Sequence, residues 1–470
     1  MRSISYLTAL VVATPCAIHG QQSLESHRPA AEKLITAALH DSAAYNRLAR
    51  LTDGFGARPS GSQNLERALD WLVAEMKKDG LENVHTEPVM VTHWVRGDES
   101  AFMETPRRVR LHILGLGRSV GTPRGGLSAP VLVVRDFAEL RARSAQAKGK
   151  IVVFDFPFDT TVHPFVAYGQ AVQYRAYGVD SAARVGAVAV LSRSATPRSL
   201  QTPHTGGLSY ADSIRRVPQI PGASITPEDA EMLHRLQQRG ETPVIRLTMR
   251  AQTLPNSPSR NVIAEIRGSE QPDEVIVIGG HIDSWDVGTG AMDDGGGAVA
   301  AWEALRLIKQ SGVRPKRTIR VVLWTNEELG LSGAFAYRDA HRSELDRHIL
   351  AMESDNGVFK PLGIFFSGSQ DGLPFARELA HLLRSAGADS VQASGPEADV
   401  WPLNSLGIPT VAINTDPTRY FWYHHTEADT IDKLDPHEMG LCVAIMAVVA
   451  NTVANMNGAV PRAPIAPPAG

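Results

Sequence analysis

A histidine and three aspartates within a short stretch of the chain have the types and spacing of a metal site. His281 and Asp293 flank a glycine-rich connection, and Asp283 and Asp294 stand next to them. A neutral imidazole and an ionised carboxylate are good zinc ligands, and a carboxylate such as Asp283 can accept the second ring N–H of His281. The glycines at 295–297 let the following helix begin near this site, with its positive end facing the carboxylates. An isolated His-x-Asp is more often part of a turn, but the Asp293–Asp294 pair favours a site.

Paired glutamates follow the apolar run 318–323. Such a pair can divide the work of hydrolysis. One glutamate binds a metal, and the other takes the proton from a water whose pKa zinc has lowered toward about 7. Most Glu-Glu pairs only occupy a solvated loop, but Glu327 and Glu328 come directly after a segment with the composition of a buried strand.

Two further groups stand after apolar runs: Asp355, and the tandem histidines His424 and His425 within an aromatic segment. Taken singly, each is typical of a turn, a helix cap or a packing residue. Together with the residues above they complete a set of two histidines and three carboxylates: His281, Asp293, Glu328, Asp355 and His425. This inventory fits two zinc ions about 3.5 to 4 Å apart that share one carboxylate.

Strands and helices alternate from residue 261 onward. The apolar patterns predict strands at 274–279, 318–324, 349–354, 363–367 and 410–415, and helices at 298–309 and 374–385. This order predicts an α/β fold, a mostly parallel mixed sheet with helices on both faces. Ligands bind outside the carboxyl ends of the strands in such sheets, where the candidate ligands fall.

The rest of the chain predicts an inserted domain and less ordered ends. Helices are expected at 30–50 and 64–78, strands at 84–95 and 109–114, and a long apolar helix at 437–455. Short apolar strands at 130–134, 151–154 and 187–191 indicate a β-rich insert that serves as a lid or a partner surface. The predicted division of the chain is a signal peptide at 1–20, an N-terminal part of the catalytic domain at 21–112, the insert at 113–252, the main part of the catalytic domain at 253–458 and a disordered tail at 459–470.

Composition excludes several classes of function. The 470 residues carry a formal net charge of -3, with no basic stripe for nucleic acid. An apolar stretch behind Arg2 predicts export, to the outside of the cell or the periplasm. Without residues 1–20 the only cysteine is Cys442, so neither a disulfide within the chain nor a thiolate metal site is expected. The apolar run 441–450 has about half the roughly 20 residues of a membrane span and is interpreted as a buried helix.

The sequence resembles the co-catalytic zinc exopeptidases that include bacterial leucyl aminopeptidases, and most closely the plasma glutamate carboxypeptidase branch of that family. The motifs that carry the resemblance are at 283–288, 291–297 and 420–426. The likeness extends over nearly the whole mature chain, the insert included. It implies the fold described above, short peptides as substrates, two zinc ions per chain, a protease-associated domain as the insert, and a homodimer.

The resemblance also implies roles for individual residues. Asp293 would bridge both zinc ions. His281 and Asp355 would complete one site, and Glu328 and His425 the other. Glu327 would be the general base, Asp283 would orient His281, and the Asp293–Asp294 peptide would be cis.

Three substrate-side assignments are weaker. The family ligand stands directly before Thr or Ser, which favours His425 over His424 as the ligand and leaves His424 as a pocket residue. Tyr423 is a candidate donor to the oxyanion, with packing as the alternative. Arg419 is a candidate anchor for a substrate carboxylate.

Three alternatives stay open. An aminopeptidase would recognise the free amine rather than the free carboxylate of its substrate. A receptor-like binding protein on the same scaffold would have lost ligands, whereas all five positions and Glu327 hold competent residues here. A single-zinc transferase or cyclase would differ in its metal count.

Overall fold

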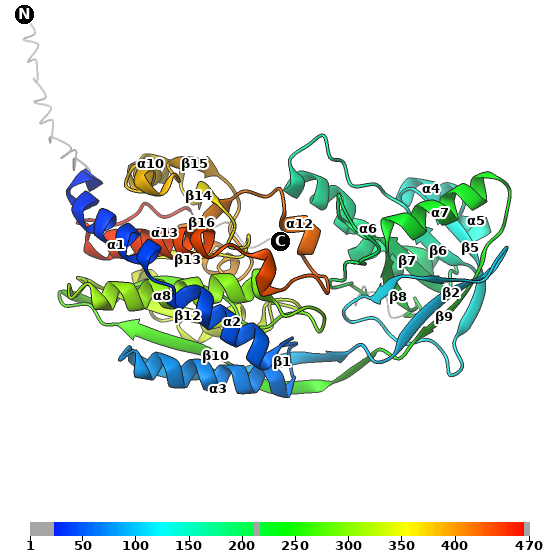
Figure 1. The fold of residues 1–470 in the computed structure, drawn as a ribbon, viewed down its shortest axis with the longest axis horizontal. Helices are drawn as coiled ribbons and strands as arrows, with labels where there is room; N and C mark the ends of the chain where they lie inside the picture. The colour runs from blue at the N-terminus through cyan, green and yellow to red at the C-terminus, as the bar shows by residue number, and fades with distance from the viewer. Residues whose placement is uncertain (1–22, 211–216, 465–470) are drawn as a thin grey trace, which may run out of the picture.

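Two bodies, each built on an eight-stranded sheet, lie side by side in the molecule (Figure 1). The computed structural model describes residues 23–210 and 217–464. The predicted signal peptide at 1–20 lies outside the described residues.

The first sheet carries the strands that were expected to form the catalytic domain. Its order is β1 (Glu82–Val95), β10 (Gln252–Ile266), β12 (Arg317–Trp324), β11 (Gln271–His281), β13 (His348–Glu353), β16 (Thr410–Thr415), β14 (Pro361–Ser367) and β15 (Ser390–Ala393). The central strands β12, β11, β13 and β16 are parallel, whereas β1 and β10 pair antiparallel at one side. The mixed α/β architecture is thus confirmed.

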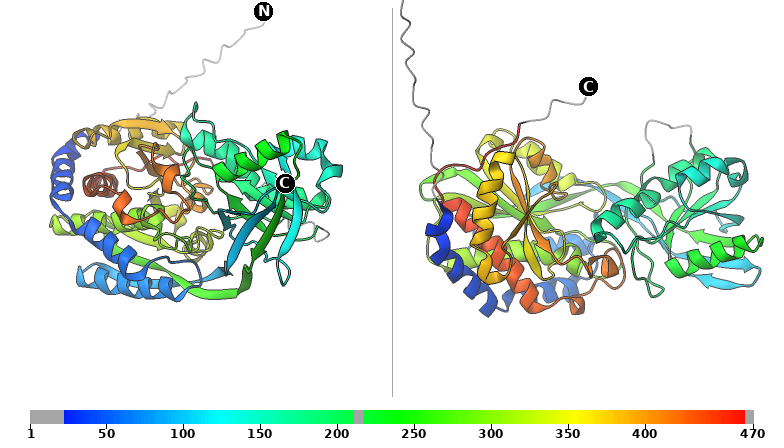
Figure 2. Two further views of the ribbon diagram at one scale, coloured as in Figure 1. Left: turned by 45° about the vertical axis from the view of Figure 1, so that its right-hand side comes forward. Right: turned by 90° about the horizontal axis from the view of Figure 1, so that it is seen from above.

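Helices cover both faces of this sheet. Side chains alternate along its buried strands, so apolar residues point to both faces and each face needs a covering layer. Ile276 and Ile278 of β11 join the main core, whereas Val275 and Val277 point to the opposite face. The main core is closed by α1 (Arg28–His40), α2 (Ala43–Phe55), α3 (Gln63–Lys78), α8 (Gly296–Gln310), α10 (Leu373–His381) and α13 (Pro436–Asn455). The opposite face is closed by α9 (Ser332–Ala340) and α11 (Trp401–Asn404), and Figure 2 shows both layers.

The first predicted helix, at 30–50, is wrong in one respect: it is two helices. Helix α1 ends at His40 and α2 begins at Ala43. The Asp41 carboxylate accepts a hydrogen bond from the Ala43 N–H at 2.7 Å. This local bond turns the chain where helical periodicity continues on both sides.

The second sheet has the order β3 (Val109–Leu111), β2 (Glu99–Thr105), β9 (Val244–Met249), β5 (Leu127–Val134), β6 (Ile151–Phe154), β7 (Ala189–Arg193), β8 (Gly222–Ile225) and β4 (Ile113–Gly115). Around it lie α4 (Phe137–Ala142), α5 (Ser144–Ala147), α6 (Pro164–Arg184) and α7 (Pro227–Gln238). Separate apolar clusters pack on its two faces. We call this unit the second body.

The second body begins earlier than residue 113, the predicted start of the insert. Strands β2 and β3 precede that residue, and β2 pairs with β9 from Glu99↔Met249 onward. Strands β1 and β10 still pair at Val95↔Gln252, so the chain leaves and re-enters the first body there. The glycine- and proline-rich stretch 115–130, just after the predicted boundary, lies inside the second body.

The C-terminal segment differs from its prediction as well. Residues 459–464 were expected to be disordered, but Arg462 donates hydrogen bonds to the carbonyls of Leu345 and His348, and Ala463 donates to Gly407. Helix α13 is long and apolar enough to cross a membrane by length and composition, yet 83% of its most apolar window is buried inside the protein. It is a core helix, as predicted for 441–450.

Candidate metal centre

The candidate ligands meet at one edge of the first sheet. Strand β11 ends at His281, β12 ends three residues before Glu327, and β13 ends two residues before Asp355. Because β12, β11, β13 and β16 are parallel, their carboxyl ends lie at the same edge. The segment after β16 brings His424 and His425 to this edge through the short helix α12 (Tyr420–Tyr423).

Asp293 lies between the two histidines, with one carboxylate oxygen toward each. His281 Nε2 is 3.1 Å from Asp293 Oδ1 and 3.4 Å from Asp355 Oδ1. His425 Nε2 is 3.1 Å from Asp293 Oδ2 and 3.2 Å from Glu328 Oε2. The five predicted ligands therefore form two groups that share Asp293.

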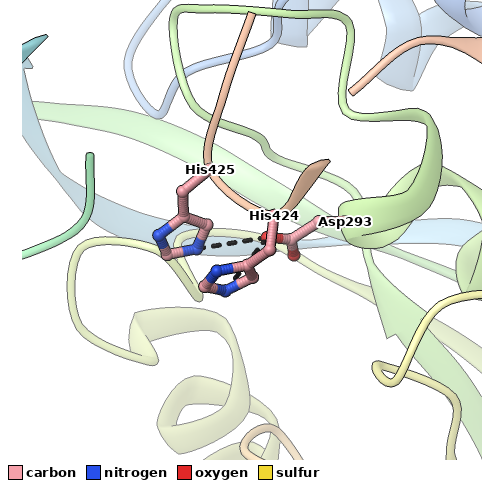
Figure 3. Close-up of side chains that lie close together, drawn as sticks. All are labelled: Asp293, His424 and His425. Carbon is pink, nitrogen blue, oxygen red and sulfur yellow. Dashed lines mark ion pairs between the residues drawn. The ribbon is translucent and has the colours of Figure 1, made fainter. Parts of the chain in front are cut away.

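His424 lies close to the same carboxylate but on its periphery. Its Nε2 is 3.7 Å from Asp293 Oδ2, and its ring stacks on that of His425 with centroids 3.5 Å apart. Figure 3 shows both imidazoles directed at Asp293. His425 has the shorter contact and also reaches Glu328, which favours it as the ligand.

The donor set suits a divalent cation. Asp293 Oδ2, Glu328 Oε1 and Asp355 Oδ1 are buried oxygens without a hydrogen bond, and His281, Asp293 and Asp355 have ligand atoms close enough to hold one ion. Buried carboxylate oxygens are rarely left without a partner. Imidazole and carboxylate together are ligands that zinc accepts.

The electrostatics of the centre reflect burial and dense charge. Burial alone would lower the pKa of His281, yet Asp293 and Asp355 raise it well above its ordinary value. Burial raises the pKa of Glu328 to about 7, and Asp293 adds to this effect. Burial, together with Glu328 and Asp355 and against the opposing effect of His281, raises the pKa of Glu327 well above its usual range. A raised pKa suits a carboxylate that must accept a proton.

Asp283 lies at the site but contacts His281 differently from the prediction. The Nδ1–H of His281 donates to the backbone carbonyl of Asp283 at 3.0 Å, whereas the Asp283 carboxylate is 3.8 Å away. That carboxylate accepts instead from the backbone N–H of Glu327 at 3.1 Å and from the Ser60 hydroxyl at 3.0 Å. Asp283 therefore holds the Glu327 backbone as well as the His281 ring.

Two acidic residues that the sequence did not single out as ligands hold the loop around Asp293. Asp429 accepts hydrogen bonds from the backbone N–H groups of Ala291, Met292 and Asp293. Asp294 accepts from the N–H of His281 at 3.0 Å, and the Asp293–Asp294 peptide is cis, as the resemblance implied. Asp429 had no local signal, because its partners lie more than 130 residues away.

The substrate-side candidates Tyr423 and Arg419 do not join the cluster. Tyr423 packs against the main core and the ring of Trp422. Arg419 forms a salt bridge with Glu438 at 2.6 Å, so its charge is already paired. The tyrosine that does reach the site is Tyr420, whose hydroxyl donates to the backbone carbonyl of Asp355 at 3.2 Å.

Known proteins match both the sequence and the fold. The model of peptidase family M28 matches residues 261–450. Carboxypeptidase Q of Xenopus laevis is 46% identical over 93% of this chain and 92% of its own length, and that of Homo sapiens is 45% identical over 94% and 92%. The chain belongs to peptidase family M28.

The solved structures agree with this assignment. A peptidase M28 precursor from Shewanella amazonensis has 34% sequence identity and a TM-score of 0.89, covering 94% of this chain and all of that one. A zinc aminopeptidase from Bacillus subtilis, at 20% identity and a TM-score of 0.63 over 86% of this chain and 93% of its own, shares the fold. The protein is a zinc metallopeptidase of the exopeptidase type, similar to carboxypeptidase Q.

Proposed function

We propose that the protein hydrolyses dipeptides or short peptides at a centre of two zinc ions per chain. Asp293 would be shared between the two ions, His281 and Asp355 would hold one of them, and Glu328 and His425 would hold the other. The observation that carries this proposal is the placement of Asp293, whose two oxygens each lie 3.1 Å from a different imidazole nitrogen. Two-metal sites use a shared carboxylate in this way.

When bound, zinc supplies a Lewis acid that lowers the pKa of water and polarises the scissile carbonyl. Glu327 takes the proton from the attacking water and passes it to the leaving amine. Asp283 holds Glu327 in place through the 3.1 Å bond from the Glu327 N–H. Exclusion of water by the buried surroundings strengthens each of these interactions.

The substrate is a peptide with a free terminus, and carboxypeptidase Q-like specificity is the version that we propose. Its support is the extent of the similarity, which covers more than 90% of the chain. The second body, close to the interval 113–252, is proposed to be a protease-associated domain that restricts access to short peptides. Export by the segment 1–20 and a homodimer complete the proposal. Gel filtration with light scattering tests the last point, and a monomer would contradict it.

The test of function is hydrolysis of a dipeptide panel with free or blocked termini by wild type and Glu327→Gln. We expect cleavage by wild type and a fall in kcat of at least 10²-fold in the variant, since a general base contributes about that much. Intolerance of a blocked carboxylate identifies a carboxypeptidase, and intolerance of a blocked amine an aminopeptidase. Activity that is unchanged by the substitution would contradict the role of Glu327.

A further inference from the structure

One loop of the second body contacts His425 through two reciprocal hydrogen bonds. The backbone N–H of Thr205 donates to the His425 carbonyl at 2.9 Å. The ring Nδ1 of His425 is 3.2 Å from the Thr205 carbonyl and donates to it. Thr205 follows β7 in the second body, whereas His425 follows α12 in the first.

His425 needs such support because of its backbone conformation. Its φ is +62°, in the left-handed region that residues with a side chain rarely adopt. This conformation directs Nε2 toward Asp293 and Glu328, at 3.1 and 3.2 Å. The Thr205 N–H donates to the carbonyl of His425, so the loop stabilises the strained conformation of His425 directly.

Thr205 is itself fixed within the second body. Arg175 of α6 donates from Nη1 to the Thr205 carbonyl at 2.9 Å, and the Thr205 hydroxyl donates to the Gly115 carbonyl at 2.7 Å. The guanidinium of Arg175 packs closely against Gly206, because a Cβ added there would lie 2.2 Å from its Cζ and 2.3 Å from its Nη1. The carbonyl that receives the His425 ring N–H therefore has a defined direction.

A second attachment holds the other end of the same segment. The Thr196 hydroxyl donates to the Phe421 carbonyl at 2.6 Å, and the rings of Phe421 and Tyr168 stack at 4.5 Å. The neighbourhood of α6 and α12 is visible in Figure 1. Residues 421–425 are thus held at both ends by the second body.

The two histidines of the centre differ in what orients them. His281 donates its Nδ1–H to the carbonyl of Asp283, within the first body, whereas His425 donates to a carbonyl of the second. Such a bond fixes the tautomer and leaves Nε2 free to bind a metal.

We propose that the second body is a structural part of the metal centre, with Thr205 and Arg175 as positioning residues that orient His425. The proposal rests on the role of His425 as a ligand. The consequence is asymmetric. Loosening the loop lowers the affinity for the zinc ion held by His425 and Glu328, and leaves the affinity for the ion held by His281 and Asp355 unchanged.

The test is a zinc competition titration of purified Arg175→Met with a chromophoric chelator. We expect one of the two zinc ions to bind several-fold more weakly, because the Thr205 carbonyl that accepts the His425 ring N–H loses the bond from Arg175 that fixes its direction. The other ion keeps its wild-type affinity. Arg184→Met is the matched control, because Arg184 lies on the same helix and, within the described part of the chain, pairs with Asp180 near the surface.

Thr205→Val gives an independent check if Arg175→Met folds poorly. It keeps the shape of the side chain and removes only the bond to Gly115, so we expect a several-fold weakening of the same ion. Wild-type affinity for both ions in the folded variants would overturn the proposal.

His425→Ala, measured in the same assay, separates this proposal from the ligand assignment. Retention of both ions by His425→Ala would contradict the ligand set itself. Loss of one ion by His425→Ala, with Arg175→Met unchanged from wild type, would refute only the role of the second body.

Discussion

Asp429 shows how much of the metal centre depends on residues that bind no metal. Its two carboxylate oxygens accept three backbone N–H groups from the loop that carries Asp293. An asparagine would present an amide N–H to one of these donors. The loop would then lose a bond and gain a repulsion.

We therefore expect Asp429→Asn to weaken zinc binding about 10- to 100-fold, with a comparable fall in kcat/KM at limiting zinc. Zinc competition and peptide hydrolysis measure the two effects. Asp432→Asn is the control, since Asp432 is exposed and, among the residues that the structure describes, bonds its neighbours Thr430 and Lys433. Equal zinc affinity in the two variants would show that Asp429 does not support the centre.

At the residue scale, the sequence places the candidate ligands better than the residues that hold them. His281, Glu328 and Asp355 each follow an apolar run, so local pattern and strand order place them at one edge of a sheet. The supporting residues act over long distances in the sequence. Asp429 and Thr205 contact residues more than 130 positions away, and Arg175 acts through Thr205. No local pattern contains that information.

At the scale of elements, the first turn of α8 packs against the backbone next to the proposed ligand Asp355, and only a glycine fits there. A Cβ on Gly297 would lie 1.8 Å from the Ser354 carbonyl and 2.4 Å from Asp294 Oδ1. The sequence predicts that the glycines at 295–297 allow this helix to begin close to the site. At Gly297 the packing requires a glycine, because there is no room for a Cβ. Ser354 directly precedes Asp355, so a displaced carbonyl would move a proposed ligand.

We expect Gly297→Ala to lower the free energy of unfolding by at least about 1–3 kcal/mol, the usual cost of overpacking, and to reduce zinc content. Urea unfolding and metal analysis measure these changes. Gly54→Ala in α2 is the matched control, because among the described residues no atom beyond the chain neighbours and the adjacent helix backbone lies within 4 Å of the added carbon, and alanine favours a helix. A neutral Gly297→Ala would contradict the packing described here.

The layer between β12, β13 and α9 contains a buried polar network with a pH-dependent member. His348 Nε2 accepts from the Tyr337 hydroxyl at 2.9 Å, and Arg320 donates to the same hydroxyl. Burial lowers the pKa of His348 from 6.5 to about 4. Below pH 6.5 the unfolded chain therefore takes up a proton that the folded chain does not, and stability falls until about pH 4.

We expect the free energy of unfolding of wild type to exceed that of His348→Gln by about 2 kcal/mol less at pH 5 than at pH 7. The size of this change follows from the difference between the pKa of His348 in the unfolded and folded chain. Urea unfolding at both pH values provides the measurement. His40→Gln, which changes an exposed histidine of α1, is the control. A constant difference for His348→Gln would mean that His348 is not held neutral.

At the scale of the whole molecule, the metal centre joins two bodies whose boundary the local pattern misplaced. Strand β2 pairs with β9 across about 140 residues of sequence, and such a pairing leaves no periodic trace near residue 99. The central alternation of strands and helices is local, which is why the first sheet was predictable and the second was only outlined.

Metal removal should affect the stability of the whole chain. Buried carboxylate oxygens without a hydrogen bond lie close together at Asp293, Glu328 and Asp355. The charges of these carboxylates repel one another when no cation is bound. Binding at a thousand times the dissociation constant adds about 4 kcal/mol. We expect a chelator to lower Tm in thermal unfolding and added zinc to restore it, in wild type and in Glu327→Gln alike. Identical melting curves would exclude a metal at this cluster.

Anomalous diffraction from crystals of the zinc-loaded protein, recorded on both sides of the zinc absorption edge, would locate the metal ions directly. We expect two peaks per chain about 3.5 to 4 Å apart, one beside His281 and Asp355, the other beside Glu328 and His425, with Asp293 between them. A single peak, or peaks away from Asp293, would contradict this expectation.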